Sequence, residues 1–303
     1  MSKKKNIVLT GALGQDGLIL SKILLKNGYN VVGIVKKTNF RKLNRIIYKK
    51  IDLLNYKKLS NFLDKVKPFG LIHLGTENPN YLELKKKKDF YINNIKATKN
   101  LINYFSRKDN RKKKLILIGS SQMYGSEKKK VNLNSKFNPI NSYAKFRVEA
   151  YNYMIEKKKK FQSNMVTAIL FNHDSKHRKD KFLIPRLTKL IKNNRLNKLN
   201  EIYHENISGD FSHAEDICLG LYKLMISKKK LDKLIFSSNT KTYINDIIHY
   251  LMKLNKSNMS LNLITKKNSF TPIGDNTATK KKLKWRTKKD IFKAAQEINS
   301  LKN

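Results

Sequence analysis

Cysteine, acidic residues and long apolar runs are scarce in this chain of 303 residues. The single cysteine, Cys218, excludes an internal disulfide and fits a reducing cytoplasm, which is the location we expect. No segment is long and apolar enough to span a membrane, so no membrane partner is expected. The short apolar run behind the basic first residues predicts a buried strand, not a signal peptide. The six histidines lack ligand spacing, so no metal site is expected.

The acidic residues number 22 against 66 lysines and arginines, which gives a formal net charge of +44. Such a charge attracts polyanions non-specifically at low salt. The lysines nevertheless lie in short runs along the whole chain, and no single element gathers them with interleaved aromatic residues. We therefore expect no specific nucleic-acid partner and interpret the lysines as solvated faces.

Glycine is also infrequent, yet three of the twelve glycines fall in one run, Gly11-Ala12-Leu13-Gly14-Gln15-Asp16-Gly17. Glycines at this spacing let the chain turn sharply after a strand and approach a pyrophosphate. The amides at the start of the following helix then face the negative charge. A plain turn is the alternative. The run lies between an apolar strand pattern and an amphipathic helix pattern, and this context favours a dinucleotide-binding loop.

Strand-like and helix-like patterns alternate along the chain, which is typical of a parallel sheet covered by helices. The predicted strands are 7–10, 31–35, 45–51, 71–74, 115–118 and 166–171. The predicted helices are 18–26, 57–66, 92–105, 143–157, 214–226, 245–254 and 291–301. We predict an α/β fold, a Rossmann-type doubly wound parallel sheet with a smaller C-terminal substrate-binding lobe. Ligands bind at the carboxyl ends of such strands.

The pattern becomes less regular after Phe171, with a proline at Pro185, and the polar residues 193–206 predict loops. We expect residues 1–171 to form the cofactor-binding Rossmann domain, with residues 209–240 returning to it. Residues 172–208 and 241–303 are then expected to form the substrate-binding lobe.

Strand 115–118 continues into Gly119-Ser120-Ser121-Gln122, and Tyr143 precedes Arg147 by four residues at the start of a predicted helix. This spacing puts both side chains on one helix face. The chain resembles the extended short-chain dehydrogenases/reductases, in which this pair is Tyr-x-x-x-Lys. The resemblance implies that Tyr143 takes a proton from a sugar hydroxyl as hydride leaves for the cofactor. The cation would stabilise the phenolate and hold the nicotinamide ribose.

Within that superfamily the chain is most similar to the GDP-mannose 4,6-dehydratase family. Gly14-Gln15-Asp16-Gly17 is typical of that family, and Leu170-Phe171-Asn172-His173-Asp174-Ser175 is close to its Leu-Phe-Asn-His-Glu-Ser. The block Asp210-Phe211-Ser212-His213-Ala214-Glu215-Asp216 resembles its Asp-Trp-Gly-His-Ala-Lys-Asp. Gly274-Asp275 with Ala278, Leu283 and Trp285 resembles its C-terminal pattern. These blocks span almost the whole chain in the family's order.

The resemblance implies a set of site residues. The cofactor pyrophosphate would lie on Gly11, Ala12, Leu13, Gly14, Gln15 and Asp16. Lys36 and Lys37 fall where the family has an arginine pair, which favours NADP over NAD, although two more lysines in a lysine-rich chain are the plainer interpretation. The other expected cofactor contacts are Asp52, Leu53, Leu74, Gly75, Thr76, Tyr143, Arg147, His173 and Arg178. Substrate contacts are expected from Asn172 and His213, and Ser120 would polarise the sugar oxygen.

Several of these residues also have a structural interpretation. Asp52 suits a turn, His173 suits a satisfied buried histidine, and His213 suits a helix cap that partners Asp216. Ser120 suits the polar end of a strand. The order of the motifs favours the functional interpretation of the set.

The chain departs from the family at catalytic positions. The glutamate that removes the C5 proton is Gln122 here, and an amide cannot act as a general base. The catalytic lysine is Arg147, whose planar head does not reproduce a point charge. A family arginine is replaced by Gly209, so a cation expected on the substrate phosphates is missing. The family's Arg-Pro-x-Glu element is replaced by Ser269-Phe270-Thr271-Pro272.

Three functional hypotheses follow. The first is a GDP-mannose 4,6-dehydratase that forms GDP-4-keto-6-deoxymannose through transient hydride transfer to NADP. The second is a nucleotide-sugar 4-ketoreductase or epimerase, favoured by Gln122. The third is a catalytically impaired homologue that binds nucleotide or partner subunits. In each case we expect a homo-oligomer.

Overall fold

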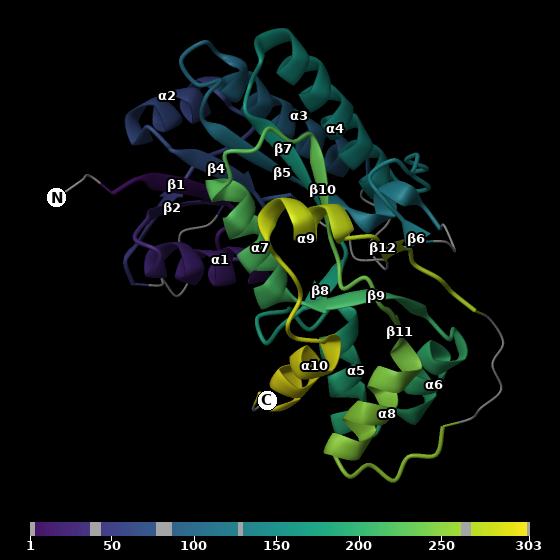
Figure 1. Ribbon diagram of the computed structural model, residues 1–303. Coiled ribbons are helices and arrows are strands. Elements are labelled where there is room, and N and C mark those ends of the chain that lie inside the picture. Colours follow the sequence, from purple (N-terminus) through teal and green to yellow (C-terminus); the bar gives the residue numbers. More distant parts are fainter. Residues whose placement is uncertain (1–3, 37–43, 77–86, 127–129, 262–267, 302–303) are drawn as a thin grey trace.

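The computed structural model describes residues 4–36, 44–76, 87–126, 130–261 and 268–301. Within these residues, seven parallel strands form a central sheet in the order β10-β7-β5-β4-β1-β2-β3 (Figure 1). Their bounds are β1 Asn6–Thr10, β2 Asn30–Val35, β3 Ile46–Lys50, β4 Gly70–His73, β5 Lys114–Ser120, β7 Met165–Leu170 and β10 Lys233–Phe236. The predicted doubly wound parallel sheet is confirmed. The inner strands are mostly apolar because helices cover both faces, whereas the edge strand β3 ends in two exposed lysines.

Side chains of β1 alternate between the two helix layers. Ile7 and Leu9 join the core under α1 (Gln15–Lys26) and α7 (Ala214–Ile226). Val8 points into the opposite core, formed with α2 (Tyr56–Val66), α3 (Lys87–Ser106) and α4 (Ser142–Phe161). This period of two fixes the register of the sheet, since a slip of one residue would reverse every side chain. No helix in the described part of the chain is long and apolar enough to cross a membrane.

A smaller lobe with its own apolar core lies below the carboxyl edge of the sheet in Figure 1. Its helices are α5 Leu183–Lys192, α6 Leu196–His204, α8 Ile244–Leu254 and α10 Ile291–Asn299. Its three-stranded sheet contains β8 Asn172–Asp174, β9 Ser208–His213 and β11 Lys241–Tyr243. The remaining elements are η1 Ser121–Tyr124, β6 Lys130–Val131, β12 Ile273–Gly274 and α9 Thr277–Leu283.

The prediction of loops over residues 193–206 was wrong, because α6 occupies most of that segment. Leu199, Ile202 and Tyr203 are buried at helical spacing on its inner face. The asparagines and lysines between them concealed this stripe, since they lie on the solvated face of the helix.

Two aspartates of the family block tie the lobe together. The buried carboxylate of Asp210 accepts hydrogen bonds from the backbone N–H groups of Ser238, Asn239 and Gly274, at 2.7, 2.9 and 3.2 Å. Asp216 accepts from the N–H groups of Lys288 and Lys289, at 2.6 and 2.7 Å. These residues therefore organise the loops and are not free for chemistry.

Candidate active site

Two adjoining cavities, of about 340 and 700 Å³, lie at the carboxyl edge of the central sheet. The larger one follows the ends of β1, β2 and β3, and the smaller one follows the ends of β4, β5 and β7. Gly11, Gly14, Thr76 and Lys179 line both. An open α/β sheet binds ligands at this edge, so the two cavities together form the candidate site.

The glycine-rich loop lies where the cavities meet. Gly11 has φ +66°, and a Cβ there would lie 2.8 Å from the Cα of Gly75. A Cβ at Gly17 would lie 2.5 Å from the Gly11 carbonyl oxygen, so α1 packs directly on the turn. Gly14 caps α1 without a side-chain hydrogen bond, which leaves the first-turn amides available to an anion. The loop therefore fits a dinucleotide pyrophosphate.

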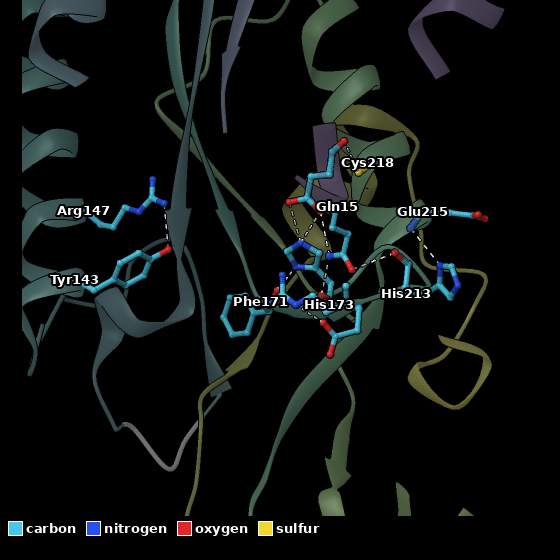
Figure 2. Close-up of polar contacts among 12 residues, drawn as sticks. Gln15, Tyr143, Arg147, Phe171, His173, His213, Glu215 and Cys218 are labelled. Carbon is cyan, nitrogen blue, oxygen red and sulfur yellow. Dashed lines mark hydrogen bonds and ion pairs between the residues drawn. The ribbon is translucent and has the colours of Figure 1, made fainter. Parts of the chain in front are cut away.

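Figure 2 shows Gln15 of this loop beside His173 of β8. The Gln15 amide donates to the His173 carbonyl oxygen at 3.2 Å and accepts from the Ser175 hydroxyl at 3.0 Å. Asp16 holds the Nε2 of His173 at 3.1 Å, and the Nδ1 donates to the Phe171 carbonyl oxygen at 2.6 Å. Two family motifs that are 157 residues apart thus form one polar network.

Charge stabilises this network. Burial disfavours the ionised form of both partners, yet the opposite charge outweighs it and lowers the pKa of Asp16 while raising the pKa of His173. Arg178 pairs with Asp174 at 2.7 Å and stacks over the Phe182 ring. His173 and Arg178, which the sequence predicted as cofactor contacts, both line the smaller cavity and are both engaged in ion pairs.

Tyr143 and Arg147 lie one turn apart on the same face of α4, at the start of the helix. Both line the smaller cavity, on the side away from His173 (Figure 2). The Arg147 Nη2 donates to the Tyr143 hydroxyl oxygen at 3.1 Å and to the Thr76 hydroxyl at 2.5 Å. Its Nη1 donates to the Ile118 carbonyl oxygen at the end of β5. Arg147 is buried, with 6% of the residue exposed. A cation thus lies against the phenol oxygen.

Ser120 and Gln122 complete this side of the cavity at the end of β5. The Ser120 hydroxyl oxygen accepts from the Gln122 N–H at 3.3 Å, which leaves its own proton for a ligand. The side-chain amide of Asn141 donates to the Gln122 Oε1 at 3.0 Å. The structure therefore brings Ser120, Gln122, Tyr143 and Arg147 together, and it holds Gln122 as a hydrogen-bonded amide.

A buried histidine that the sequence did not indicate lies beneath the site. His73 ends β4, with its Nδ1 2.7 Å from the Thr10 hydroxyl and its Nε2 3.1 Å from the Thr98 hydroxyl. Thr10 in turn accepts from the Gly75 N–H at 2.8 Å. Burial and the charge of Arg147 lower the pKa of His73 to about 3. It is therefore neutral and adds no second positive charge beside Arg147.

The larger cavity is lined by the predicted Lys36, Asp52 and Leu53, and also by Lys50 and Lys179. The Asp52 carboxylate accepts from the Leu54 N–H at 2.9 Å, so it shapes a turn and lines the cavity at once. Lys37 lies outside the described residues. The sequence did not predict Lys50 and Lys179, because each enters the cavity from a strand end or connection without a motif of its own.

Comparisons with known proteins identify the family. A family model described as GDP-mannose 4,6 dehydratase matches residues 8–298. The chain belongs to the GDP-mannose 4,6-dehydratase family. GDP-mannose 4,6 dehydratase 1 of Arabidopsis thaliana is 24% identical to it, covering 94% of this chain and 86% of that protein. The GDP-mannose 4,6 dehydratase of Dictyostelium discoideum is 25% identical, covering 79% of this chain and 73% of that protein.

Solved structures show the same fold. The dTDP-glucose 4,6-dehydratase of Bacillus anthracis, in complex with NAD, superposes with a TM-score of 0.81 at 15% identity, covering 97% of this chain and 95% of its own. The UDP-glucuronic acid 4-epimerase of Bacillus cereus, in complex with UDP-glucuronic acid and NAD, gives 0.81 at 20% identity and covers 97% and 98%. At these identities the likeness concerns the fold alone.

Two predicted substrate residues of this family member lie in different places. Asn172 lines the smaller cavity. His213 is fully buried, lines neither cavity and caps α7 by accepting from the Glu215 N–H at 3.2 Å. Its Nε2 lies 3.3 Å from Glu297 of α10. His213 therefore has the helix-cap role that was its structural interpretation, with the Glu215 N–H and not Asp216 as partner.

The predicted residues divide between the cavities as follows. The smaller cavity is lined by Gly11, Gly14, Gln15, Asp16, Leu74, Thr76, Ser120, Gln122, Tyr143, Arg147, Asn172, His173 and Arg178. The larger cavity is lined by Gly11, Ala12, Leu13, Gly14, Lys36, Asp52, Leu53, Gly75 and Thr76.

Proposed function

We propose that this protein is an NADP-dependent nucleotide-sugar enzyme that oxidises the C4 hydroxyl of GDP-mannose, with 4,6-dehydration as the first candidate outcome. The observation that carries the proposal is the hydrogen bond from Arg147 to the Tyr143 oxygen, inside a cavity that adjoins the glycine-rich loop. Family membership supports the sugar nucleotide, and the NAD-bound neighbours support a nicotinamide cofactor.

NADP is proposed over NAD because of charge in the larger cavity. Lys36, Lys50 and Lys179 line it, against Asp52 as the one carboxylate among its described lining residues. An NAD site usually presents a carboxylate to the free ribose hydroxyl, whereas cations accommodate the additional phosphate of NADP. Lys36 directly follows β2 at its carboxyl end and lines this cavity.

The chain's own groups suffice for the proton transfers of the redox step. Tyr143 as a phenolate takes the proton of the sugar hydroxyl, while Arg147 stabilises the negative charge on its oxygen. The Ser120 hydroxyl donates a hydrogen bond to the same sugar oxygen. The glycine-rich loop would hold the nicotinamide cofactor, which when bound would supply a reversible hydride acceptor for the sugar carbon.

The Gln122–Asn141 hydrogen bond favours a second candidate, a 4-ketoreductase or 4-epimerase. Elimination of water needs a group that removes the C5 proton, and an amide has no such capacity. Asp16 is the one carboxylate among the described residues of the smaller cavity, and His173 already pairs with it. His177 also lines this cavity, and burial together with the charges of Lys22 and Lys176 lowers its pKa, so the imidazole is neutral. If water is eliminated, His177 is therefore our candidate for the group that removes the C5 proton.

Incubation of the protein with GDP-mannose and NADP, followed by mass analysis, distinguishes these outcomes. Loss of one water supports dehydration, and replacement of His177 by glutamine should then abolish it. Without water loss, reduction of a GDP-4-keto sugar by NADPH supports the ketoreductase. Absence of both reactions with NADP and GDP-mannose bound contradicts the proposal.

The variant Gln122→Glu tests whether the absence of a carboxylate at position 122 limits water loss. It restores a carboxylate of nearly the same shape, so we expect water loss to rise at least about 10²-fold, the low end for a general base. Gln162→Glu, at the C-terminal end of α4, makes the same charge change far from the cavity and should have no effect. Equal rates in the two variants contradict the role assigned to position 122.

A further inference from the structure

Position 209 cannot supply the cation that the family resemblance places there. A Cβ on Gly209 would lie 1.8 Å from the hydroxyl oxygen of Thr271. Thr271 is fixed in that place, because its N–H donates to the Ser208 carbonyl oxygen at 2.8 Å. The space of the side chain is thus filled by the segment that replaces the Arg-Pro-x-Glu element. Positive charge for a substrate diphosphate has to come from another element.

Four lysines and arginines line the smaller cavity, and two of them are already committed. Arg147 binds Tyr143, Thr76 and a β5 carbonyl oxygen, and Arg178 pairs with Asp174. The other two are Lys179 and Lys181. Both are exposed, and neither forms an ion pair with another residue of the described ranges.

These two lysines belong to the segment 175–182, which is held in place by several contacts. Ser175 at its start donates to Gln15 of the glycine-rich loop, at 3.0 Å. The Phe182 N–H at its end donates to the Lys179 carbonyl oxygen at 3.0 Å, and the Arg178 guanidinium lies 3.6 Å from the centre of the Phe182 ring. The segment therefore brings Lys179 and Lys181 to the lining of the smaller cavity, which Tyr143 lines as well. Figure 2 shows Tyr143 and Arg147 to one side of the His173 network.

We propose that Lys179 and Lys181 bind the diphosphate of the nucleotide-sugar substrate and replace the missing cation of position 209. This inference rests on the proposed function. The cofactor also carries a diphosphate, and Lys179 lines both cavities. Lys181 lines the smaller cavity alone, so it is assigned to the substrate. A diphosphate is shared by all nucleoside diphosphate sugars, so the contact does not select the base.

Calorimetric titration with GDP, UDP and NADP at physiological salt tests the assignment. We expect Lys181→Ala to weaken GDP and UDP binding about tenfold, the loss of one charge-assisted contact. The double variant Lys179→Ala with Lys181→Ala should lose more, while NADP binding to Lys181→Ala stays unchanged. Lys189→Ala removes an exposed lysine of α5 that lines neither cavity and corrects for the general attraction of a +44 chain.

Each result has a distinct meaning. Unchanged GDP and UDP binding in the double variant, with normal binding by the natural chain, overturns this inference and leaves the proposed function standing. Weaker NADP binding with unchanged GDP binding overturns it too, because the lysines then belong to the cofactor. If the natural chain binds NADP but neither nucleoside diphosphate, the nucleotide-sugar function fails together with this inference.

Discussion

The two walls of the smaller cavity differ in how closely they follow the family. On the loop wall, Gln15 and Asp16 keep the family's identities and contact His173 and Ser175, which belong to a second retained motif. On the helix wall, Gln122 and Arg147 depart from the family. The departures are nevertheless accommodated, since Asn141 binds the Gln122 amide and Thr76 binds the Arg147 guanidinium. The loop wall thus keeps the family's residues, whereas the helix wall holds different residues in their own hydrogen bonds.

The largest effect is expected on the helix wall from Tyr143→Phe. Removal of the hydroxyl should lower turnover about 10³-fold, because the proton acceptor for the sugar hydroxyl is lost. NADP affinity and the unfolding midpoint should stay close to those of the natural chain, since the ring keeps its packing against Phe146. Steady-state kinetics with a calorimetric NADP titration checks both. Turnover within tenfold of the natural chain would remove Tyr143 from the mechanism.

On the loop wall, Asp16→Asn should destabilise the fold by about 3 kcal/mol, because it leaves His173 without its counter-charge in a buried site. The pKa of Asp16 is lowered and that of His173 is raised, so the pair stabilises most between their ordinary values of 3.8 and 6.5. The contribution is lost as the pH falls through the folded-state pKa of Asp16 or rises through that of His173.

Urea unfolding of the natural chain and Asp16→Asn across this range measures the difference. Asp64→Asn serves as the control, because its ion pair with Arg107 is about 40% exposed and such pairs contribute below about 1 kcal/mol. A difference for Asp16→Asn that is constant with pH would show that the ion pair does not cause it.

His73, which lies beneath the site, should make the stability of the fold sensitive to acid. The pKa of His73 is about 3 in the folded chain and about 6.5 in the unfolded chain. Below pH 6.5 the unfolded chain therefore binds a proton at His73 and the folded chain does not. Between pH 7 and pH 4.5 this should cost about 2–3 kcal/mol of unfolding free energy. His73→Gln should lack that part of the acid loss. Equal pH slopes for the two proteins would contradict a neutral His73.

The smallest effect is expected in the larger cavity. Lys36→Ala should weaken NADP binding about tenfold and leave NAD binding unchanged, if Lys36 faces the additional phosphate. Lys49→Ala, an exposed lysine of β3 that lines neither cavity, is the matched control. Equal losses for NADP and NAD would show that Lys36 contacts a group common to both cofactors.

The parallel sheet was predictable from the sequence because local apolar runs specify it. The glycine-rich loop followed from its position between β1 and α1. Helix α6 escaped prediction although Leu199, Ile202 and Tyr203 carried a helical signal, because polar residues surround them.

Contacts across the fold were less accessible to the sequence. The Asp16–His173 pair joins residues 157 apart, and no spacing rule relates them. His213 matched a family block, but only the structure shows that its side chain points into the protein and caps α7. A residue in a family motif can therefore have a purely structural role, and the burial of its side chain reveals that role.

A single-turnover experiment tests the central claim, that the Tyr143–Arg147 pair still drives hydride transfer from a GDP-linked sugar. Excess protein loaded with NADP is mixed with GDP-mannose, and the near-ultraviolet absorbance of reduced nicotinamide is followed by stopped flow. We predict a rise in absorbance with the natural chain and with Gln122→Glu, and none with Tyr143→Phe. No rise with the natural chain, when titration shows that both ligands are bound, would contradict the account.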